Sequence, residues 1–431
     1  MAQLIYDESG RLLFTKEMKE EYTLLMPQML PVHFGMMRKM LECEGYKVDM
    51  LTTNHRGIVD EGLKYVHNDT CYPALLVIGQ LMDAVKNGGY DPHKVALLIT
   101  QTGGGCRASN YIHLLRKALE KADMAYIPVV SVNFSGLEKN PGFSVPPRLL
   151  LKLVYGMLYG DLLMNVANQV RPYEVNPGQT DRTVELWSQR LVDGFQHGKG
   201  TSRGQMRAIF DEICADFAAI PVEGGPKIRV GVVGEIYVKF APLGNNNLEQ
   251  FLLSEGAEPV VPGLIDFILY CIYSRIVDVD LYGGSRLVKL VAGTLLKYVE
   301  GCQKDMIAAL ERSGRFRAPG TFKQLHDMVG GYLGKGNKMG EGWLLTAEML
   351  ELIHSGTPNI VCTQPFGCLP NHIVGKGMIR KLKDEYPHTN IVAIDYDPGA
   401  TKINQENRIK LMLANARGLA KEAGALESAE A

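Results

Sequence analysis

The sequence predicts an α/β protein of two lobes, each built on a parallel sheet, with a helical region connecting them. Continuous apolar strands alternate with helical patterns in two separate segments, and long helical patterns fill the stretch between these segments. Strands that are apolar throughout are buried on both faces, which is typical of parallel sheets covered by helices. We expect the lobes over residues 1–140 and 227–415, the connector over 141–226, and an Ala/Glu-rich tail over 416–431.

Each element is predicted from its local pattern. In the first lobe we expect strands over 23–30, 46–51, 94–100 and 126–133, and helices over 32–45, 73–85 and 110–121. In the connector we expect helices over 146–170, 181–195 and 202–219, bounded by Pro/Gly-bearing segments at 172–178 and 220–226. In the second lobe we expect strands over 227–236, 258–263, 359–365 and 390–397, and helices over 247–255, 369–386, 402–414 and several between 264 and 354.

Composition excludes several classes of protein. The 431 residues carry 46 Lys+Arg against 47 Asp+Glu, a net charge of −1, which disfavours nucleic acid and anionic membranes as partners. The apolar stretches at 149–168 and 262–275 are interrupted by charges or too short to span a bilayer, so we expect buried core helices. The N-terminal residues lack the pattern of a signal peptide, and we expect a cytoplasmic protein.

Eight cysteines are too few for a disulfide scaffold in a chain of this length. Four of them lie on apolar faces of predicted helices, and free cysteine in such a place behaves as a small buried hydrophobe. We therefore expect plain core positions for Cys43, Cys214, Cys271 and Cys302.

The other four cysteines lie at strand ends or helix starts, two in each lobe: Cys71, Cys106, Cys362 and Cys368. A helix N-terminus offers unpaired N–H groups and partial positive charge, which lower a thiol pKa and stabilise thiolate. Ligands in open α/β sheets gather beyond the carboxyl ends of the strands. This context predicts one iron–sulfur cluster of the 4Fe–4S type held across the cleft between the lobes. A zinc site and unrelated structural thiols are the alternatives.

Two glycine-rich segments imitate nucleotide-binding motifs. Residues 103–108 match the dinucleotide pattern, but the following strand ends in Ser131, Val132 and Asn133 without the acidic residue that binds ribose, which disfavours NAD. Residues 334–343 lack the Lys-Ser/Thr pair of a P-loop. The glycines at 103–105 more simply allow the backbone to approach a cluster or ligand closely.

Five further residues are candidates for substrate chemistry. Lys335 and Lys338, with the turn amides around them, predict a site for a phosphate of a CoA-like substrate. The alternative is a plain turn in which Glu341 favours the positive end of the next helix. Glu235 follows an apolar strand and His372 follows Cys368 by four residues, so either side chain is placed to protonate a substrate. A hydrogen-bonded structural role is the alternative for His372.

Several separated motifs resemble the 2-hydroxyacyl-CoA dehydratase superfamily. The resemblance is nearest to its branch of acyl-CoA dehydratase activase-related proteins, near the double-cubane-cluster proteins, and it spans roughly residues 20–415. The segments that carry it are NDTCYPA, VGEIYVKF, GNKMGEGWLLTAEM, CTQPFGCLPNHIVGKGMIRKL and AIDYDPGATKINQENRIKLML.

The resemblance implies Rossmann-like lobes that enclose a cysteine-bound iron–sulfur cluster, and a homodimer. It implies a partner activase, here a separate chain, that hydrolyses ATP to inject one low-potential electron. In the dehydratases that electron forms a ketyl radical from a 2-hydroxyacyl-CoA, and water leaves. In the double-cubane branch an 8Fe–9S cluster is associated with reduction of small molecules. The cluster-ligand role carries over to Cys71, Cys106, Cys362 and Cys368 only.

The number of thiolates separates the expected activities. Three would leave one iron of a cubane free for substrate, whereas four would close the cluster and favour electron transfer. A double cubane would need about six, for which Cys43 or Cys302 would have to contribute. The sequence therefore leaves open a dehydratase or reductase component, a non-catalytic electron carrier or maturation partner, and a double-cubane small-molecule reductase.

Overall fold

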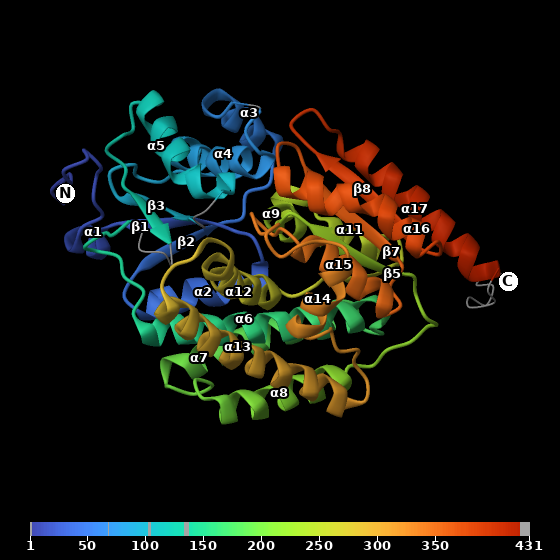
Figure 1. Cartoon of the computed structure of the whole chain (residues 1–431). Coiled ribbons are helices and arrows are strands. Elements are labelled where there is room, and N and C mark those ends of the chain that lie inside the picture. The colour runs from blue at the N-terminus through green and yellow to red at the C-terminus, as the bar shows by residue number, and fades with distance from the viewer. Residues whose placement is uncertain (1, 68, 102–104, 133–137, 423–431) are drawn as a thin grey trace.

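The computed structural model describes residues 2–67, 69–101, 105–132 and 138–422. It contains two four-stranded parallel sheets with helices around them (Figure 1), which confirms the predicted α/β class. The first sheet consists of β1 (Thr23–Pro27), β2 (Lys47–Leu51), β3 (Val95–Thr100) and β4 (Val129–Val132). The second consists of β5 (Arg229–Gly234), β6 (Glu258–Val260), β7 (Asn359–Pro365) and β8 (Asn390–Tyr396).

The two sheets share one strand order. The orders are β2-β1-β3-β4 and β6-β5-β7-β8, so the first strand of each lobe lies second in its sheet. Thr23 of β1 accordingly pairs with both Lys47 and Val95 on its neighbouring strands. The strand order reverses between β1 and β3 and between β5 and β7. Loops that follow these strands diverge at such switch points, where ligands of open α/β sheets bind.

Helices surround both sheets and fill the region between them. The first lobe has α1 (Lys16–Glu21), α2 (Pro31–Cys43), α3 (Arg56–Tyr65), α4 (Tyr72–Asn87), a 3₁₀ turn (Arg107–Asn110) and α5 (Tyr111–Lys121). The connector has α6 (Pro147–Val170), α7 (Gln179–Gln196) and α8 (Arg203–Ala218). The second lobe has α9 (Ile236–Phe240), α10 (Pro242–Asn245), α11 (Leu248–Ser254), α12 (Leu264–Tyr282), α13 (Arg286–Ser313), α14 (Phe322–Met328), α15 (Leu344–His354), α16 (Ile379–Glu385) and α17 (Lys402–Glu422).

One apolar core continues across the two lobes. Leu97 of β3 and Ile78 of α4 belong to the same buried cluster as Val232 of β5 and Tyr396 of β8. A second cluster joins the other face of the first sheet to α2, α6 and α13. Figure 1 shows α4 and α5 on one side of the first sheet and α2 and α6 on the other. Because the lobes share buried apolar surface, the loops at their junction are held in fixed positions.

The predicted helix over 369–386 is confirmed as a helical segment, but it is not one regular α-helix. Residues 369–370 are α-helical, Asn371–Gly375 form a π-helical turn, a 3₁₀ turn follows at Lys376–Met378, and α16 completes the segment. The Asn371 side chain donates a hydrogen bond to the Thr363 carbonyl, 3.0 Å away, and the Thr346 hydroxyl donates to the Val374 carbonyl. These bonds to β7 and α15 widen the turn. The sequence also missed α1 and α3, and α17 extends to Glu422, inside the predicted tail.

The longest apolar helix is part of the core. The helix over Pro147–Tyr173 has the length and apolarity of a membrane span, but 67% of its most apolar window is buried inside the fold. This confirms the core role predicted for 149–168. The other stretch, 262–275, forms α12, and there the prediction holds only in part. Leu264, Leu269 and Tyr270 are buried, whereas Cys271 is exposed.

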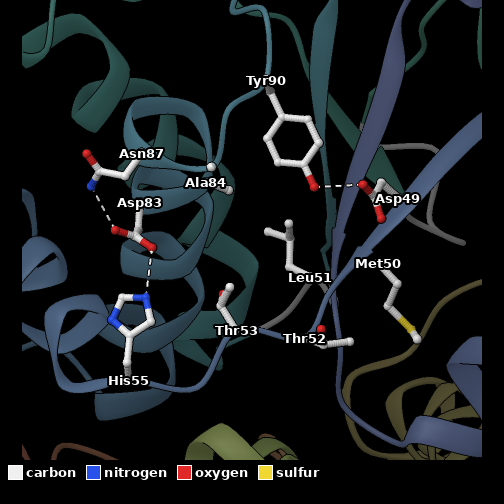
Figure 2. A pocket seen from close by; sticks show the side chains of 11 residues that line it. Asp49, Met50, Leu51, Thr52, Thr53, His55, Asp83, Ala84, Asn87 and Tyr90 are labelled. Atoms are coloured by element: carbon white, nitrogen blue, oxygen red, sulfur yellow. Dashed lines mark hydrogen bonds and ion pairs between the residues drawn. The ribbon is translucent and has the colours of Figure 1, made fainter.

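A pocket of about 510 Å³ opens at the edge of the first sheet, beyond β2 (Figure 2). Tyr90 donates a hydrogen bond to Asp49 across its mouth, 2.7 Å long, and Asp83 pairs with His55 at 3.3 Å. None of the site residues that the sequence predicts lines this pocket. Asp49 and Asp83, the two carboxylates of this pocket, are thus bonded to neighbouring side chains. The predicted site residues lie elsewhere, and most of them lie between the lobes.

Candidate functional site

The loop that carries Cys368 packs against the start of α4. Cys71 is the N-cap residue of α4, and the next amide, of Tyr72, donates a hydrogen bond to the Phe366 carbonyl at 2.9 Å. Gly367 has a φ of +74°, and a Cβ atom there would stand 2.9 Å from the Cys71 Cα. Only glycine tolerates both the left-handed backbone and this approach. The two cysteine-bearing turns of different lobes are therefore in direct contact.

Cys106 is brought to the same place by a third loop. It precedes the 3₁₀ turn after β3, and a Cβ atom on Gly340 would stand 3.8 Å from its Sγ and 3.3 Å from the Pro370 ring. The thiols of Cys71 and Cys106, and those of Cys71 and Cys368, lie close enough for their charges to interact. Three of the four predicted cysteines thus come together at the junction of the lobes. We call Cys71, Cys106, Cys368, Glu235 and Glu341 the thiol site.

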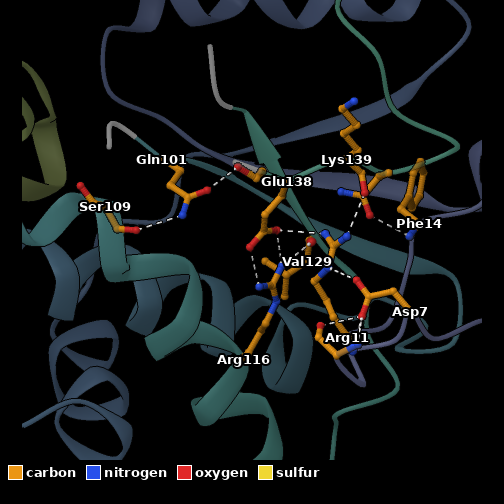
Figure 3. Close-up of polar contacts among 12 residues, drawn as sticks. Asp7, Arg11, Phe14, Gln101, Ser109, Arg116, Val129, Glu138 and Lys139 are labelled. Atoms are coloured by element: carbon orange, nitrogen blue, oxygen red, sulfur yellow. Dashed lines mark hydrogen bonds and ion pairs between the residues drawn. The ribbon is translucent and has the colours of Figure 1, made fainter. Parts of the chain in front are cut away.

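Polar contacts fix the Cys106 turn to the first sheet (Figure 3). The Gln101 amide donates to the Ser109 carbonyl at 3.1 Å, and the Ser131 hydroxyl donates to the Gln101 oxygen at 3.0 Å. Arg107 donates to the Asp69 carbonyl at 2.9 Å, which ties this turn to the Cys71 loop. Gly103 and Gly104, which were predicted to allow close approach to a ligand, lie outside the described residues.

Cys362 does not join the other three. It lies within β7, fully buried among Val233, Met349 and Leu382, on the sheet face that α15 and α16 cover. Its thiol is 3.8 Å from the Asn371 Oδ1 atom. Side chains alternate between the faces of a strand, so Cys362 points into the core and not beyond the end of the sheet. The expectation that all four thiols converge is corrected to three.

Two buried carboxyl groups lie beside the thiols, at the start of the short helix α9. Glu235 is the N-cap residue and accepts a hydrogen bond from the Val238 amide at 2.9 Å. Glu341 accepts a hydrogen bond from the Ile236 amide at 3.0 Å, so it caps α9. The alternative for the 334–343 turn, in which Glu341 favours the start of the next helix, is therefore not the contact that this side chain makes. The charges of Glu235 and Glu341 both act on the thiols of Cys106 and Cys368. The site combines thiols with proton-carrying acids.

Burial controls the protonation of these groups. It raises the pKa of Cys71 to about 11 and that of Cys106 to about 12, and it raises the pKa of Cys368 further. The lowered thiol pKa expected at helix N-termini is therefore wrong for the free thiols, because desolvation outweighs the nearby N–H groups. Burial, followed by repulsion from Glu341, raises the pKa of Glu235 to about 8, and burial also raises that of Glu341.

The Glu235 shift predicts a pH-dependent stability. Its pKa is about 8 in the folded chain against an ordinary 4.5, so the folded form binds the proton more tightly. The protonated Glu235 therefore contributes fully to the free energy of unfolding below about pH 4.5, and this contribution is lost as the pH rises towards 8. We expect the apoprotein variant Glu235→Gln, which stays neutral, to be more stable than wild type at pH 8 by about 4 kcal/mol, and by less than about 1 kcal/mol at pH 5.

Urea unfolding at the two pH values measures this difference. The exposed Glu120→Gln is the matched control and is expected to follow the wild type at both pH values. An equal stability of Glu235→Gln and wild type at pH 8 would show that Glu235 is already ionised and stabilised there.

Of the three other predicted polar residues, Lys335 and Lys338 make structural contacts and His372 is exposed to solvent. Lys335 lies 4.2 Å above the Trp343 ring and donates to the His326 carbonyl, and burial lowers its pKa to about 8. Lys338 pairs with Asp278 at 2.6 Å. Both lysines thus anchor the 334–343 loop that contacts Cys106. His372 has an exposed side chain on the π-helical turn.

The structure adds residues that the sequence did not assign. The Tyr111 hydroxyl lies 2.7 Å from the Cys71 Sγ atom, and no motif marks this tyrosine. Cys271, expected in the core, is exposed on α12 within electrostatic reach of Glu341. Cys43, the last residue of α2, is also exposed, whereas Cys214 and Cys302 are buried as predicted.

No family model and no curated protein matches the chain. The family resemblance therefore stays a prediction that depends on the motifs themselves, and the three converging thiols are an independent observation. Among the described residues, no group of three or more His, Cys, Asp or Glu side chains is spaced to hold a single metal ion. A cubane holds its cysteines farther apart than one ion does, because each sulfur binds a different corner.

Proposed function

We propose that the thiol site binds an iron–sulfur cluster and that the protein works in chemistry of the 2-hydroxyacyl-CoA dehydratase type. The observation that supports this most is the meeting of three free thiols from two lobes, next to two buried acids. Cys71 and Cys106 come from the loops of the first lobe and Cys368 from the second. Glycine backbone at 340 and 367 approaches them closely, which suits loops packed around a bulky group.

The proposed ligand set is Cys71, Cys106 and Cys368. Three thiolates leave one iron of a 4Fe–4S cubane without a protein ligand, and this arrangement favours a substrate-binding centre over a closed electron carrier. A double cubane would need about six thiolates, so three thiols favour the single cubane. When bound, the cluster supplies one low-potential electron to the substrate. Binding iron also stabilises the thiolate forms that burial alone disfavours.

The buried acids supply the proton that dehydration needs. A hydroxyl group leaves as water only when it gains a proton, and a carboxyl whose pKa is near 8 holds that proton at neutral pH. Glu235 is fixed by the Val238 amide and Glu341 by the Ile236 amide, so neither needs to reorganise. We assign the proton-donor role to this pair. The exposed His372 is the weaker candidate.

The electron would enter next to Cys368. Three apolar side chains around this cysteine are exposed, namely Phe366 at 47%, Leu369 at 67% and Ile373 at 54%. Apolar side chains gathered on a surface mark protein contacts. We assign this surface to the separate ATP-hydrolysing activase. If the site never meets a substrate, the same surface serves a non-catalytic electron carrier or maturation partner.

Anaerobic purification followed by iron and sulfide assays tests the cluster. About four irons per chain are expected for one cubane, and about eight would indicate the bridged form. A folded protein that contains no iron, either as purified or after incubation with iron and sulfide, would contradict the proposal. Adding a 2-hydroxyacyl-CoA to the reduced protein is expected to perturb its electron paramagnetic resonance signal. An unchanged signal would favour the electron carrier over the dehydratase.

A further inference from the structure

Among the residues that the structure describes, only one thiol of the thiol site has a side-chain hydrogen-bond partner. The Tyr111 hydroxyl lies 2.7 Å from the Cys71 Sγ atom. The three thiols are otherwise alike, because burial raises the pKa of each and a nearby backbone amide opposes the rise. These amides belong to Ala74 for Cys71, to Ala108 for Cys106 and to Asn371 for Cys368. The hydroxyl therefore distinguishes Cys71 from the other two cysteines.

Tyr111 is held in place by the turn that carries Cys106. It is the first residue of α5, directly after the 3₁₀ turn Arg107–Asn110 that follows Cys106. A hydrogen bond of 2.9 Å from this turn to the Asp69 carbonyl ties it to the loop before Cys71. The tyrosine ring is buried in the apolar cluster that the two lobes share. The loop after β3 thus supplies one thiol of the site and a hydroxyl group for another thiol.

Iron binding would decide the direction of this hydrogen bond. In the metal-free protein, either the thiol or the hydroxyl can donate. A cysteine sulfur that binds iron is a thiolate, which has no proton to donate. The phenol group of tyrosine, with an ordinary pKa of about 10, keeps its proton at neutral pH. With iron bound, the Tyr111 hydroxyl is therefore the donor and the Cys71 sulfur is the acceptor.

We propose that Tyr111 is a positioning residue that acts through Cys71 and raises the reduction potential of the cluster. This inference rests on the proposed function, because it requires iron at the thiol site. Hydrogen bonds to the cysteine sulfurs are among the factors that set the reduction potential of an iron–sulfur cluster. The reduced cluster carries one more negative charge than the oxidised cluster, so an O–H donor stabilises the reduced form more. The hydroxyl thus makes the cluster easier to reduce.

Burial gives this hydrogen bond its strength. Cys71 is 6% exposed and Tyr111 is 9% exposed, so water does not compete for either group. A hydrogen bond to a charged group is stronger in such a medium than in water. We expect the hydroxyl to change the equilibrium constant for one-electron reduction about tenfold, which corresponds to about 59 mV.

The test compares the midpoint potentials of wild type and Tyr111→Phe, which removes the hydroxyl and keeps the ring. The full-length proteins are purified anaerobically with their cluster, and a redox titration is followed by electron paramagnetic resonance. We expect the variant to keep the iron content of the wild type, since all three proposed ligands remain, and its potential to be lower by about 59 mV. Electron–nuclear double resonance in H₂O and D₂O should show that one exchangeable proton coupled to the reduced cluster is lost.

Tyr159→Phe is the matched control. Tyr159 is also buried, on α6, and its hydroxyl donates to the Gly200 carbonyl at 3.2 Å. The control variant loses one buried hydrogen bond of a tyrosine and is expected to keep the wild-type potential. A purely structural role of the Tyr111 hydroxyl would lower the stability of its variant and leave the potential where it is.

Each result decides the inference. Full iron content with an unchanged potential in Tyr111→Phe would overturn it and leave the proposed function intact. Equal shifts in both variants, or loss of iron from Tyr111→Phe alone, would also overturn it, because the hydroxyl would then act on folding or on cluster retention. A wild-type protein that binds no iron would overturn the proposed function together with this inference.

Discussion

Replacing Cys368 with alanine is expected to remove the iron from the purified protein, from about four irons per chain to fewer than one. The thiol of Cys368 is the contribution of the second lobe to the three that meet at the junction. Without the Cys368 thiol, only the two thiols of the first lobe remain as ligands, and we expect two cysteines to be too few to retain the proposed cluster. Iron and sulfide assays with visible absorbance, under anaerobic conditions, measure the effect.

Cys362→Ala is the matched control, because Cys362 is also free and buried and lies only six residues away. Its side chain packs in the core of the second lobe, so the variant should keep its iron and lose about 1–2 kcal/mol of stability through the small cavity. Equal iron loss in both variants would restore the four-cysteine set. Full iron content in both would refute a cluster at the thiol site.

The fold was predictable because its signal is local. Strands such as KVALLIT and NIVCTQP are apolar along their whole length, and only burial on both faces explains such runs. The segment 369–386 is helical as predicted, but its π and 3₁₀ turns were not predictable, because a sequence pattern does not contain tertiary hydrogen bonds. The apolar spacing was helical, but the Asn371 amide is drawn to the Thr363 carbonyl of β7. Partners distant in sequence thus decided the local conformation.

The site was predictable only in part, for a reason visible in the strand itself. Cys362 is the fourth residue of a seven-residue strand, so it points to one face of the sheet, whereas Cys368 lies beyond the last strand residue, Pro365. Strand alternation could have separated these two cysteines. Nothing in the sequence could have shown that Tyr111 meets Cys71, or that Glu341 caps α9, because both contacts join segments 40 or more residues apart.

The pKa values show the same limit. The sequence places three cysteines near helix N-termini, which lowers a thiol pKa in an exposed setting. The structure buries these thiols next to Glu235 and Glu341, and burial raises their pKa values instead. The partial positive charge at the helix N-termini is therefore not sufficient to stabilise thiolates in this site. If the proposed cluster binds, we expect its binding to deprotonate the thiols and release protons.

The buried ion pair between Lys239 and Glu348 is expected to produce the largest single effect on stability. The Lys239 Nζ atom donates to the Glu348 carboxylate at 2.9 Å, and the side chains are only 4% and 3% exposed. Lys239→Met leaves an uncompensated carboxylate in the core, which costs about 3–5 kcal/mol. The double variant Lys239→Met/Glu348→Met removes both charges and is expected to recover most of this loss. Urea unfolding of the three proteins gives the coupling energy.

The pH dependence of the single variant decides whether charge or packing is responsible. Burial already raises the pKa of Glu348, and loss of Lys239 removes the group that lowers it. The unpaired carboxyl then takes up a proton on folding, so its penalty is small at pH 5 and grows as the pH rises to 8. A loss of stability in Lys239→Met that is equal at both pH values would instead show that Lys239 acts through its packing on Phe240. The Lys239 Nζ atom lies 4.4 Å from the centroid of that ring. Because Lys239 and Glu235 lie on the same turn of chain, loss of the ion pair is also expected to displace the acid beside the thiols.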